Sequence, residues 1–263
     1  MNKQGLAPLG LAIDIDETLA ATIDHWLGLV RERFQDLLDV SICDLSNNEL
    51  IKRFGFAQNI PGWAGTPVVE QWIEEACYDK DIISETPPIE YAIDTLQGLV
   101  ASGLIEVKAY LTMRPTEVDH ATADWLQQHN FPHAPLLSKP ENVAIQDRYL
   151  WKAQTLSNMF PSIGGIVDDH PTVVRMLPES YPGTYFLFGH EDSKVEELGR
   201  TDIEVVPCVD WKAVKKTLTG NIHRYQKKLD LGDGLSLKSR SVEIQKDVLL
   251  GHESSESVRL NVR

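Results

Sequence analysis

The chain has 263 residues, with 25 lysines and arginines against 39 aspartates and glutamates, and a formal net charge of −14 at pH 7. Its hydrophobic fraction of 42% is enough to build a buried core. Because non-specific binding to nucleic acid depends on clustered positive charge, we do not expect a nucleic-acid partner.

The N-terminal third of the sequence predicts one strand followed by helices. Leu9 to Ile15 is a short apolar run that ends in acidic residues, which is typical of a buried parallel strand. Helical patterns then cover residues 22–38, 46–56 and 67–78. Ser46, followed by Glu49 three residues later, predicts a capping box at the start of the second helix.

From Pro87 onward the sequence alternates between helical and strand patterns. We expect helices over residues 89–102, 117–129, 146–160 and 211–218. We expect strands over residues 105–112, 134–137, 163–167, 185–188 and 204–206. Alternation of this kind predicts an α/β fold, a Rossmann-like parallel sheet with helices on both faces.

The predicted organisation is a core that an all-helical cap interrupts after the first strand. Residues 1–19 and 86–220 would form the catalytic α/β core, and residues 20–85 the helical cap. Residues 221–263 would form a C-terminal extension, partly disordered or an oligomer contact, since they show no strong periodicity. The sequence does not indicate an oligomeric state.

The cysteines and the N-terminal residues indicate where in the cell the protein is expected. Cys43, Cys77 and Cys208 are scattered, without a CxxC spacing, and are expected to be buried apolar residues. An odd number of cysteines fits a reducing cytoplasm, so we predict a cytoplasmic protein. The apolar run at the N-terminus is too short for a signal peptide, and no run reaches the roughly 18 apolar residues of a membrane span.

Polar residues follow three of the predicted strands at the point where each strand ends. They are Asp14-Ile15-Asp16-Glu17-Thr18, Thr112-Met113-Arg114-Pro115 and Asp168-Asp169-His170. Each motif alone is common as a turn or a helix cap, but in a parallel sheet all three would meet at one edge, where ligands bind. Four aspartates there would repel one another unless a cation lay between them. Ligands that are all oxygen favour a hard ion, and Mg²⁺ with a phosphate is the usual arrangement.

With these motifs in place, residues 9–190 resemble the haloacid dehalogenase-like (HAD) superfamily. The first motif of that family, DxDxT, resembles IDIDETLA, and the second, a strand that ends in Thr or Ser, resembles AYLTMRP. Lys152 in RYLWKAQTL is similar to the lysine of the third motif, and GGIVDDHPTVV is similar to the fourth. The position of the helical insertion matches what the family calls a C1 cap.

The resemblance implies a role for each matched residue. Asp14 would attack phosphorus as a nucleophile, giving an aspartyl-phosphate that water then cleaves. Asp16 would protonate the leaving alcohol and then take a proton from the attacking water. Thr112 would donate a hydrogen bond to a phosphoryl oxygen, and Lys152 would add a positive charge there. Dehalogenases of the family do not need the second aspartate, so its presence favours phosphate-ester hydrolysis.

The family resemblance also implies a magnesium site. The Asp14 carboxylate, the Asp16 backbone carbonyl and Asp168 would hold the Mg²⁺, with Asp169 as an additional ligand or a partner of one. Lys139 in LLSKP is an alternative to Lys152, because it too follows a predicted strand, but Lys152 is favoured by its place before the fourth strand.

A histidine beside the motifs and three cap tryptophans remain to be assigned. His170 receives no catalytic role, since a histidine after Asp-Asp is equally typical of a helix start. The cap tryptophans Trp26 and Trp72 fit a helix-packing core. Trp63 lies in a Pro-Gly turn, so it is predicted to bind substrate by stacking on a base.

The predicted function is a Mg²⁺-dependent phosphohydrolase with a small phosphorylated substrate. The cap and the motif spacing look most like deoxyribonucleotidase-type members, so a nucleoside monophosphate is the leading candidate and a sugar phosphate the nearest rival. A nucleic-acid end-processing phosphatase shares the motifs but is disfavoured by the acidic charge. A non-catalytic binding protein on this fold is disfavoured by the intact set of aspartates.

Overall fold

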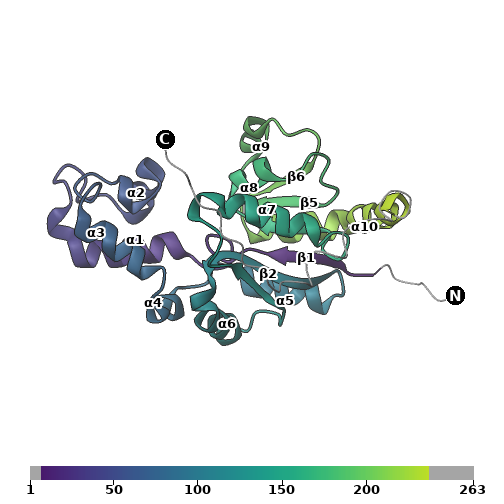
Figure 1. The fold of residues 1–263 in the computed structure, drawn as a ribbon, viewed down its shortest axis with the longest axis horizontal. Coiled ribbons are helices and arrows are strands. Elements are labelled where there is room, and N and C mark those ends of the chain that lie inside the picture. The colour runs from purple at the N-terminus through teal and green to yellow at the C-terminus, as the bar shows by residue number, and fades with distance from the viewer. Residues whose placement is uncertain (1–6, 237–263) are drawn as a thin grey trace, which may run out of the picture.

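A wholly parallel six-stranded sheet forms the centre of the computed structural model, which describes the backbone of residues 7–236 and the side chains of residues 7–227 (Figure 1). The strand order is β3-β2-β1-β4-β5-β6, and all neighbours pair in parallel. The strands are β1 (Leu9–Ile13), β2 (Ile105–Pro115), β3 (Leu136–Lys139), β4 (Gly165–Asp168), β5 (Thr184–Phe188) and β6 (Glu204–Cys208). The predicted α/β architecture is confirmed.

Helices cover both faces of the sheet because β1 is apolar on both sides. Leu11 and Ile13 pack into one hydrophobic cluster, whereas Ala12 between them packs into the other. The first cluster includes α5 (Ala92–Ala101), α6 (Asp119–Gln128) and α10 (Trp211–Ser236). The second includes α7 (Arg148–Asn158), α8 (Pro171–Met176) and α9 (Asp192–Leu198). A strand buried on both faces lies at the centre of such a fold, and the site below begins where β1 ends.

The last helix runs past the predicted boundary at residue 220. α10 does not end near Leu218 but continues through Gly220 to Ser236, since a single glycine inside a helix costs only about 1 kcal/mol. Ile222 and Tyr225 are buried in the core cluster. Residues 221–226 therefore belong to the core, while the remaining predicted extension, 237–263, lies outside the described residues. None of the described helices is long and apolar enough to cross a lipid bilayer.

The cap is all helical, as predicted, and lies beyond the carboxyl edge of the sheet (Figure 1). Its helices are α1 (Thr22–Phe34), α2 (Asn47–Phe54), α3 (Pro67–Ala76) and α4 (Lys80–Glu85). The predicted capping box is present: the Ser46 hydroxyl accepts from the Glu49 backbone, and the Glu49 carboxylate accepts from the Ser46 backbone. α1, α2 and α3 enclose a hydrophobic cluster of their own.

Trp63 does not face the substrate cavity, contrary to the prediction. Its side chain is 0% exposed in the centre of the cap cluster, and its indole N–H donates to the Phe34 carbonyl at 3.0 Å. The turn around it folds inward because Gly62 has a φ of +93° and lies directly against the Leu37 backbone, where a side chain could not fit. Trp63 is a packing residue of the cap.

Two adjacent chain crossings join the cap to the core. The Ala21 N–H donates to the Pro87 carbonyl at 2.9 Å, and the Ile89 N–H donates to the Leu19 carbonyl at 2.7 Å. Two buried core tryptophans hold the crossings: the Trp125 indole donates to Thr86 O at 2.7 Å, and the Trp211 indole to Thr18 O at 2.8 Å. We propose that core and cap divide at this crossing, close to residues 20 and 85.

The three cysteines are free thiols with different burial. Cys208 is buried, as predicted, whereas Cys43 and Cys77 are only half-buried, so the prediction is right for Cys208 alone. Burial raises the pKa of Cys77 and of Cys208 to about 11. Both are therefore neutral thiols at physiological pH, and neither has the ionised form that a nucleophile needs.

Candidate active site

A tight turn after β1 places the first motif at the carboxyl edge of the sheet. The Asp14 N–H donates to the Val167 carbonyl of β4 at 2.9 Å, which extends the strand pairing by one residue. The carbonyl of Ile15 then accepts from both Leu19 and Ala20. This turn directs Asp14 and Asp16 into a cavity beneath the cap.

A buried lysine lies between two aspartates at the bottom of this site. The Lys152 ammonium is 2.5 Å from Asp14 Oδ1 and 2.5 Å from Asp168 Oδ2, and it is 0% exposed. Burial alone would lower the pKa of Lys152, but the two carboxylates hold that pKa above its usual value. Burial likewise raises the pKa of Asp14 to about 7, although Lys152 opposes the shift. One positive charge thus partly compensates several negative ones.

Three carboxylates form a candidate metal centre. Asp14, Asp168 and Asp169 each offer an oxygen, and these oxygens lie within 4.8 Å of one another. The His170 N–H donates to Asp168 Oδ1 at 2.8 Å, which orients that side chain. Burial, and then the neighbouring Asp14, raises the pKa of Asp169 well above its usual value. An all-oxygen donor set with more negative charge than Lys152 can balance fits a hard divalent cation such as Mg²⁺.

Arg114 holds Asp16 in a two-pronged ion pair. The guanidinium Nε lies 3.1 Å from each carboxylate oxygen, and its Nη2 donates to Oδ1 at 2.7 Å. The Thr22 hydroxyl donates to the same oxygen at 2.6 Å. Burial would raise the pKa of Asp16, but the Arg114 guanidinium outweighs it and lowers that pKa below its usual value. Asp16 is therefore held in the form that accepts a proton.

Replacing Arg114 should change how activity depends on pH. In Arg114→Met the pKa of Asp16 rises, so the acid limb of the pH–rate profile should move to higher pH. We expect kcat at neutral pH to fall roughly ten- to hundredfold, as the proton carrier is no longer held in place. Arg114→Lys keeps the charge without the planar fork and should lose less. Phosphate release measured across pH checks both variants.

Arg200 provides the control for this experiment. It makes a similar two-pronged pair with Asp202, with contacts of 2.7 and 2.8 Å, and does not line the cavity. Arg200→Met should leave the pH profile in place even if it lowers stability. An Arg114→Met enzyme with the wild-type acid limb would contradict the assigned effect on Asp16.

The remaining predicted residues are Thr112, His170 and the two alternative lysines, Lys152 and Lys139. Thr112 is completely buried at the rim end of β2, and its hydroxyl accepts from the Arg114 N–H at 3.1 Å. Lys139 does not line the cavity, and its ammonium donates to the carbonyls of Pro140 and Val143. Lys152, not Lys139, therefore lies at the site. His170 begins α8, where its ring nitrogen accepts from the Thr172 N–H.

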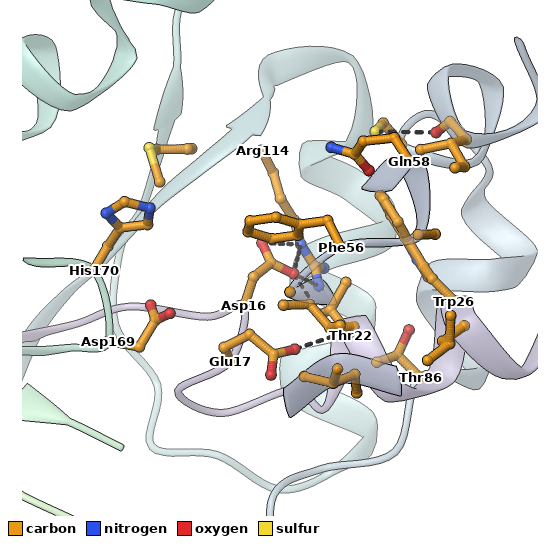
Figure 2. A pocket seen from close by; sticks show the side chains of 18 of the residues that line it. Asp16, Glu17, Thr22, Trp26, Phe56, Gln58, Thr86, Arg114, Asp169 and His170 are labelled. Carbon is orange, nitrogen blue, oxygen red and sulfur yellow. Dashed lines mark hydrogen bonds and ion pairs between the residues drawn. The ribbon is translucent and has the colours of Figure 1, made fainter. Parts of the chain in front are cut away.

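A cavity of about 500 Å³ separates the aspartates from the cap (Figure 2). Asp14, Asp16 and Asp169 line its core side, whereas Lys152 and Asp168 are buried beneath them. A volume of this size suits a small molecule more than a polymer.

The sequence motifs missed two cations of the cavity wall. Arg114 is part of the second motif, but no role was predicted for it from the sequence. It lies two residues after Thr112, so both side chains are expected on the same face of the strand, and this spacing could have identified it. Arg148 also lines the cavity, one helical turn before Lys152 on α7. Its guanidinium lies 4.4 Å from the centre of the Tyr149 ring and forms no ion pair with a described carboxylate.

Comparison with known proteins finds structural neighbours only. No family model and no curated protein matches the sequence. A predicted phosphatase from Clostridium acetobutylicum is similar at 12% identity, with a TM-score of 0.49 over 81% of this chain and 99% of its own. A HAD family hydrolase from Deinococcus radiodurans, with bound phosphate and sodium, is similar at 16% identity, with a TM-score of 0.44 over 85% and 98%. A HAD-superfamily hydrolase of subfamily IA from Geobacter sulfurreducens is similar at 14% identity, with a TM-score of 0.39 over 72% and 90%.

The structural neighbours are thus HAD-superfamily hydrolases and phosphatases, at low identity. Similarity at this level does not carry over an activity, a metal or a substrate.

Proposed function

We propose that this protein is a Mg²⁺-dependent phosphohydrolase that acts on a small phosphate monoester through an aspartyl-phosphate on Asp14. One observation carries the proposal: Asp14, Lys152, Asp168 and Asp169 converge at one end of the sheet, beneath a cavity of about 500 Å³. A carboxylate and a fixed cation side by side supply what phosphoryl transfer needs, namely position and charge compensation.

The residues divide the reaction into two steps. An Asp14 oxygen bonds to phosphorus while the bond to the leaving oxygen breaks. The leaving oxygen takes from Asp16 a proton that Asp16 first received from the singly protonated phosphate of the substrate. Water then attacks the aspartyl-phosphate and gives its proton to Asp16, which frees Asp14 and phosphate. Because the Arg114 pair favours the proton-accepting form of Asp16, it assists the second step. Lys152 and the Thr112 hydroxyl would compensate charge on the phosphoryl oxygens.

Asp14, Asp168 and Asp169 would hold the metal ion, with the backbone carbonyl of Asp16 as a further ligand. When bound, Mg²⁺ supplies positive charge that offsets both the carboxylates and the phosphoryl group. The fixed Lys152 and the orientation of Asp168 by the His170 N–H prepare these carboxylates for that role.

Mg²⁺ should stabilise the protein and be required for activity. An ion present at about 100 times its Kd adds about 2.7 kcal/mol to the free energy of unfolding, so the melting temperature should rise by several degrees. A chelator should abolish phosphate release from a panel of phosphorylated metabolites. Calorimetric melting with Mg²⁺ or chelator, and phosphate release under the same conditions, provide the measurements.

The Asp168→Asn variant tests whether Mg²⁺ stabilises the protein through the proposed metal centre. It keeps the shape of the side chain but removes a charge of the proposed metal centre, so its melting temperature should respond far less to Mg²⁺. Asp202→Asn, a remote aspartate outside the cavity, should respond as the wild type does. An unchanged Mg²⁺ response in Asp168→Asn would refute the metal assignment. Failure of every phosphate ester on the panel would refute the phosphohydrolase.

For the substrate, the nucleoside monophosphate suggested by the sequence remains our leading proposal, with a sugar phosphate as its rival. The cap covers the aspartates and leaves room for a small molecule, which disfavours a nucleic-acid end. A cytoplasmic location also remains a proposal, supported by the free thiols.

A further inference from the structure

The two sides of the cavity differ in chemistry. The charged side chains that line it, such as Asp16, Arg148 and Asp169, belong to the core segments. The lining residues that come from the cap carry no carboxylate, ammonium or guanidinium. The cap side is mainly apolar and includes Trp26, Leu27, Val30, Ile51, Phe56 and Ile73. A substrate held by its phosphate at the core therefore meets an apolar surface with its leaving group.

Phe56 is the most exposed part of that surface. It follows α2 in a turn, and it is 50% exposed although it borders the cavity. Phe56, Trp26 and Gln58 project from the cap on the side of the cavity opposite Asp169 and His170 (Figure 2). A ring left half-exposed at the wall of a pocket gains free energy when a ligand covers it.

Polar groups on the cap side are few. The Thr22 hydroxyl already donates to Asp16 at 2.6 Å. The Gln58 amide lines the cavity and forms no hydrogen bond with another described side chain or backbone group. A leaving group with many hydroxyls would lose their hydration here without finding partners, at a cost for each unpaired group. A flat apolar ring with one polar edge would meet both the aromatic surface and the Gln58 amide.

We propose that the substrate is a phosphate monoester whose leaving group carries an aromatic ring, and that this ring lies against Phe56 and Trp26 with a polar edge toward Gln58. The proposal rests on the phosphohydrolase function and narrows its substrate class. Nucleoside monophosphates and simple aryl phosphates share this chemistry, whereas sugar phosphates lack it. Aromatic side chains provide such a surface for bases and other rings because each ring offers a flat face for stacking.

The test compares kcat/KM for three substrates: a nucleoside 5′-monophosphate, phenyl phosphate and glucose 6-phosphate. We expect the wild type to prefer one or both aromatic esters. Phe56→Ala should lower kcat/KM for the preferred aromatic ester roughly ten- to hundredfold, and for glucose 6-phosphate little. Phe56→Trp keeps an aromatic face and should restore most of the loss. Gln58→Ala should lower activity on the nucleotide more than on phenyl phosphate, which has no polar edge.

Tyr78→Ala provides the matched control. Tyr78 is an aromatic residue of the cap, 56% exposed, that does not line the cavity, so its loss should change none of the three values. Equal losses on all three substrates in Phe56→Ala, or glucose 6-phosphate as the best substrate, would overturn the aromatic proposal and leave the phosphohydrolase standing. If Asp14-dependent hydrolysis is absent for every phosphate ester, both proposals fail together.

Discussion

Asp14→Asn should abolish turnover while the protein remains folded. An amide is a poor nucleophile and a poor metal ligand, so we expect kcat to fall roughly a thousandfold or more. The fold should persist because asparagine has the same shape, and because burial disfavours the charge that the substitution removes, as the raised pKa of Asp14 indicates. Phosphate release and thermal melting measure the two effects.

Two further measurements sharpen the Asp14 experiment. Wild-type protein quenched in acid during turnover should carry a phosphoryl group on the peptide that contains Asp14, detectable by mass spectrometry. Asp94→Asn, an exposed aspartate on α5, should retain wild-type activity. If Asp14→Asn kept more than a trace of activity, or the phosphoryl group lay on another residue, the covalent mechanism would be wrong.

Lys152→Met should cause the largest loss of stability of any substitution proposed here. Methionine fills a similar volume, but it leaves Asp14 and Asp168 buried together without a compensating charge. Breaking a buried ion pair by removing one partner typically costs about 3–5 kcal/mol of the free energy of unfolding. Activity should be lost as well, since the phosphoryl group would lose its fixed cation. Chemical denaturation with an independent activity assay provides both values.

The pH dependence separates lost charge compensation from lost packing. The pKa of Asp14 is already raised to about 7 from 3.8. A carboxyl whose pKa is raised in the folded state destabilises the fold, and this penalty shrinks as pH falls from the raised pKa toward the ordinary value of 3.8. Loss of Lys152 raises the pKa of Asp14 further, so the stability gap between Lys152→Met and wild type should narrow as pH falls toward about 7 and change little from about pH 7 to about pH 5. A gap that is constant with pH would point to packing alone.

Lys139→Met is the matched control for Lys152. Lys139 is a partly buried lysine of the same rim, but its ammonium donates only to backbone carbonyls. Its replacement should cost on the order of 1 kcal/mol and leave activity near the wild-type level. If Lys139→Met lost activity and Lys152→Met did not, the lysine of the site would be misassigned.

The sequence predicted those features that depend on local pattern. Strand ends carry Asp14, Thr112 and Asp168 to one edge because parallel strands run in the same direction, and periodicity alone identifies the strands. Lys152 followed from the family resemblance, and its place on the helix before β4 favoured it over Lys139. These inferences need no knowledge of side-chain conformation, so they could be made without coordinates.

The features that were missed depend on how side chains and turns cross the molecule. Arg114 reaches from the end of β2 to Asp16 in the turn after β1, a pair 98 positions apart. Phe56 falls within the range predicted for a helix, but α2 ends at Phe54, and Gly55, with a φ of +78°, turns the chain so that Phe56 borders the cavity. Trp63 had no helical stripe to assign it inward or outward. In each case tertiary geometry decides what the local pattern leaves open.

The position of β1 at the centre of the sheet has a consequence for synthesis on the ribosome. β1 is made first, but its neighbours are β2 and β4, and β4 begins only at Gly165. The cap cluster lies within residues 27–73, so its contacts can form as soon as that stretch has emerged. β1 meanwhile lacks its second neighbour for roughly 8–30 s, at about 5–20 residues per second. A nascent chain that stalls before Gly165 would thus expose the unpaired β4-facing edge of an apolar strand beside a folded cap, the kind of species that aggregates or engages chaperones.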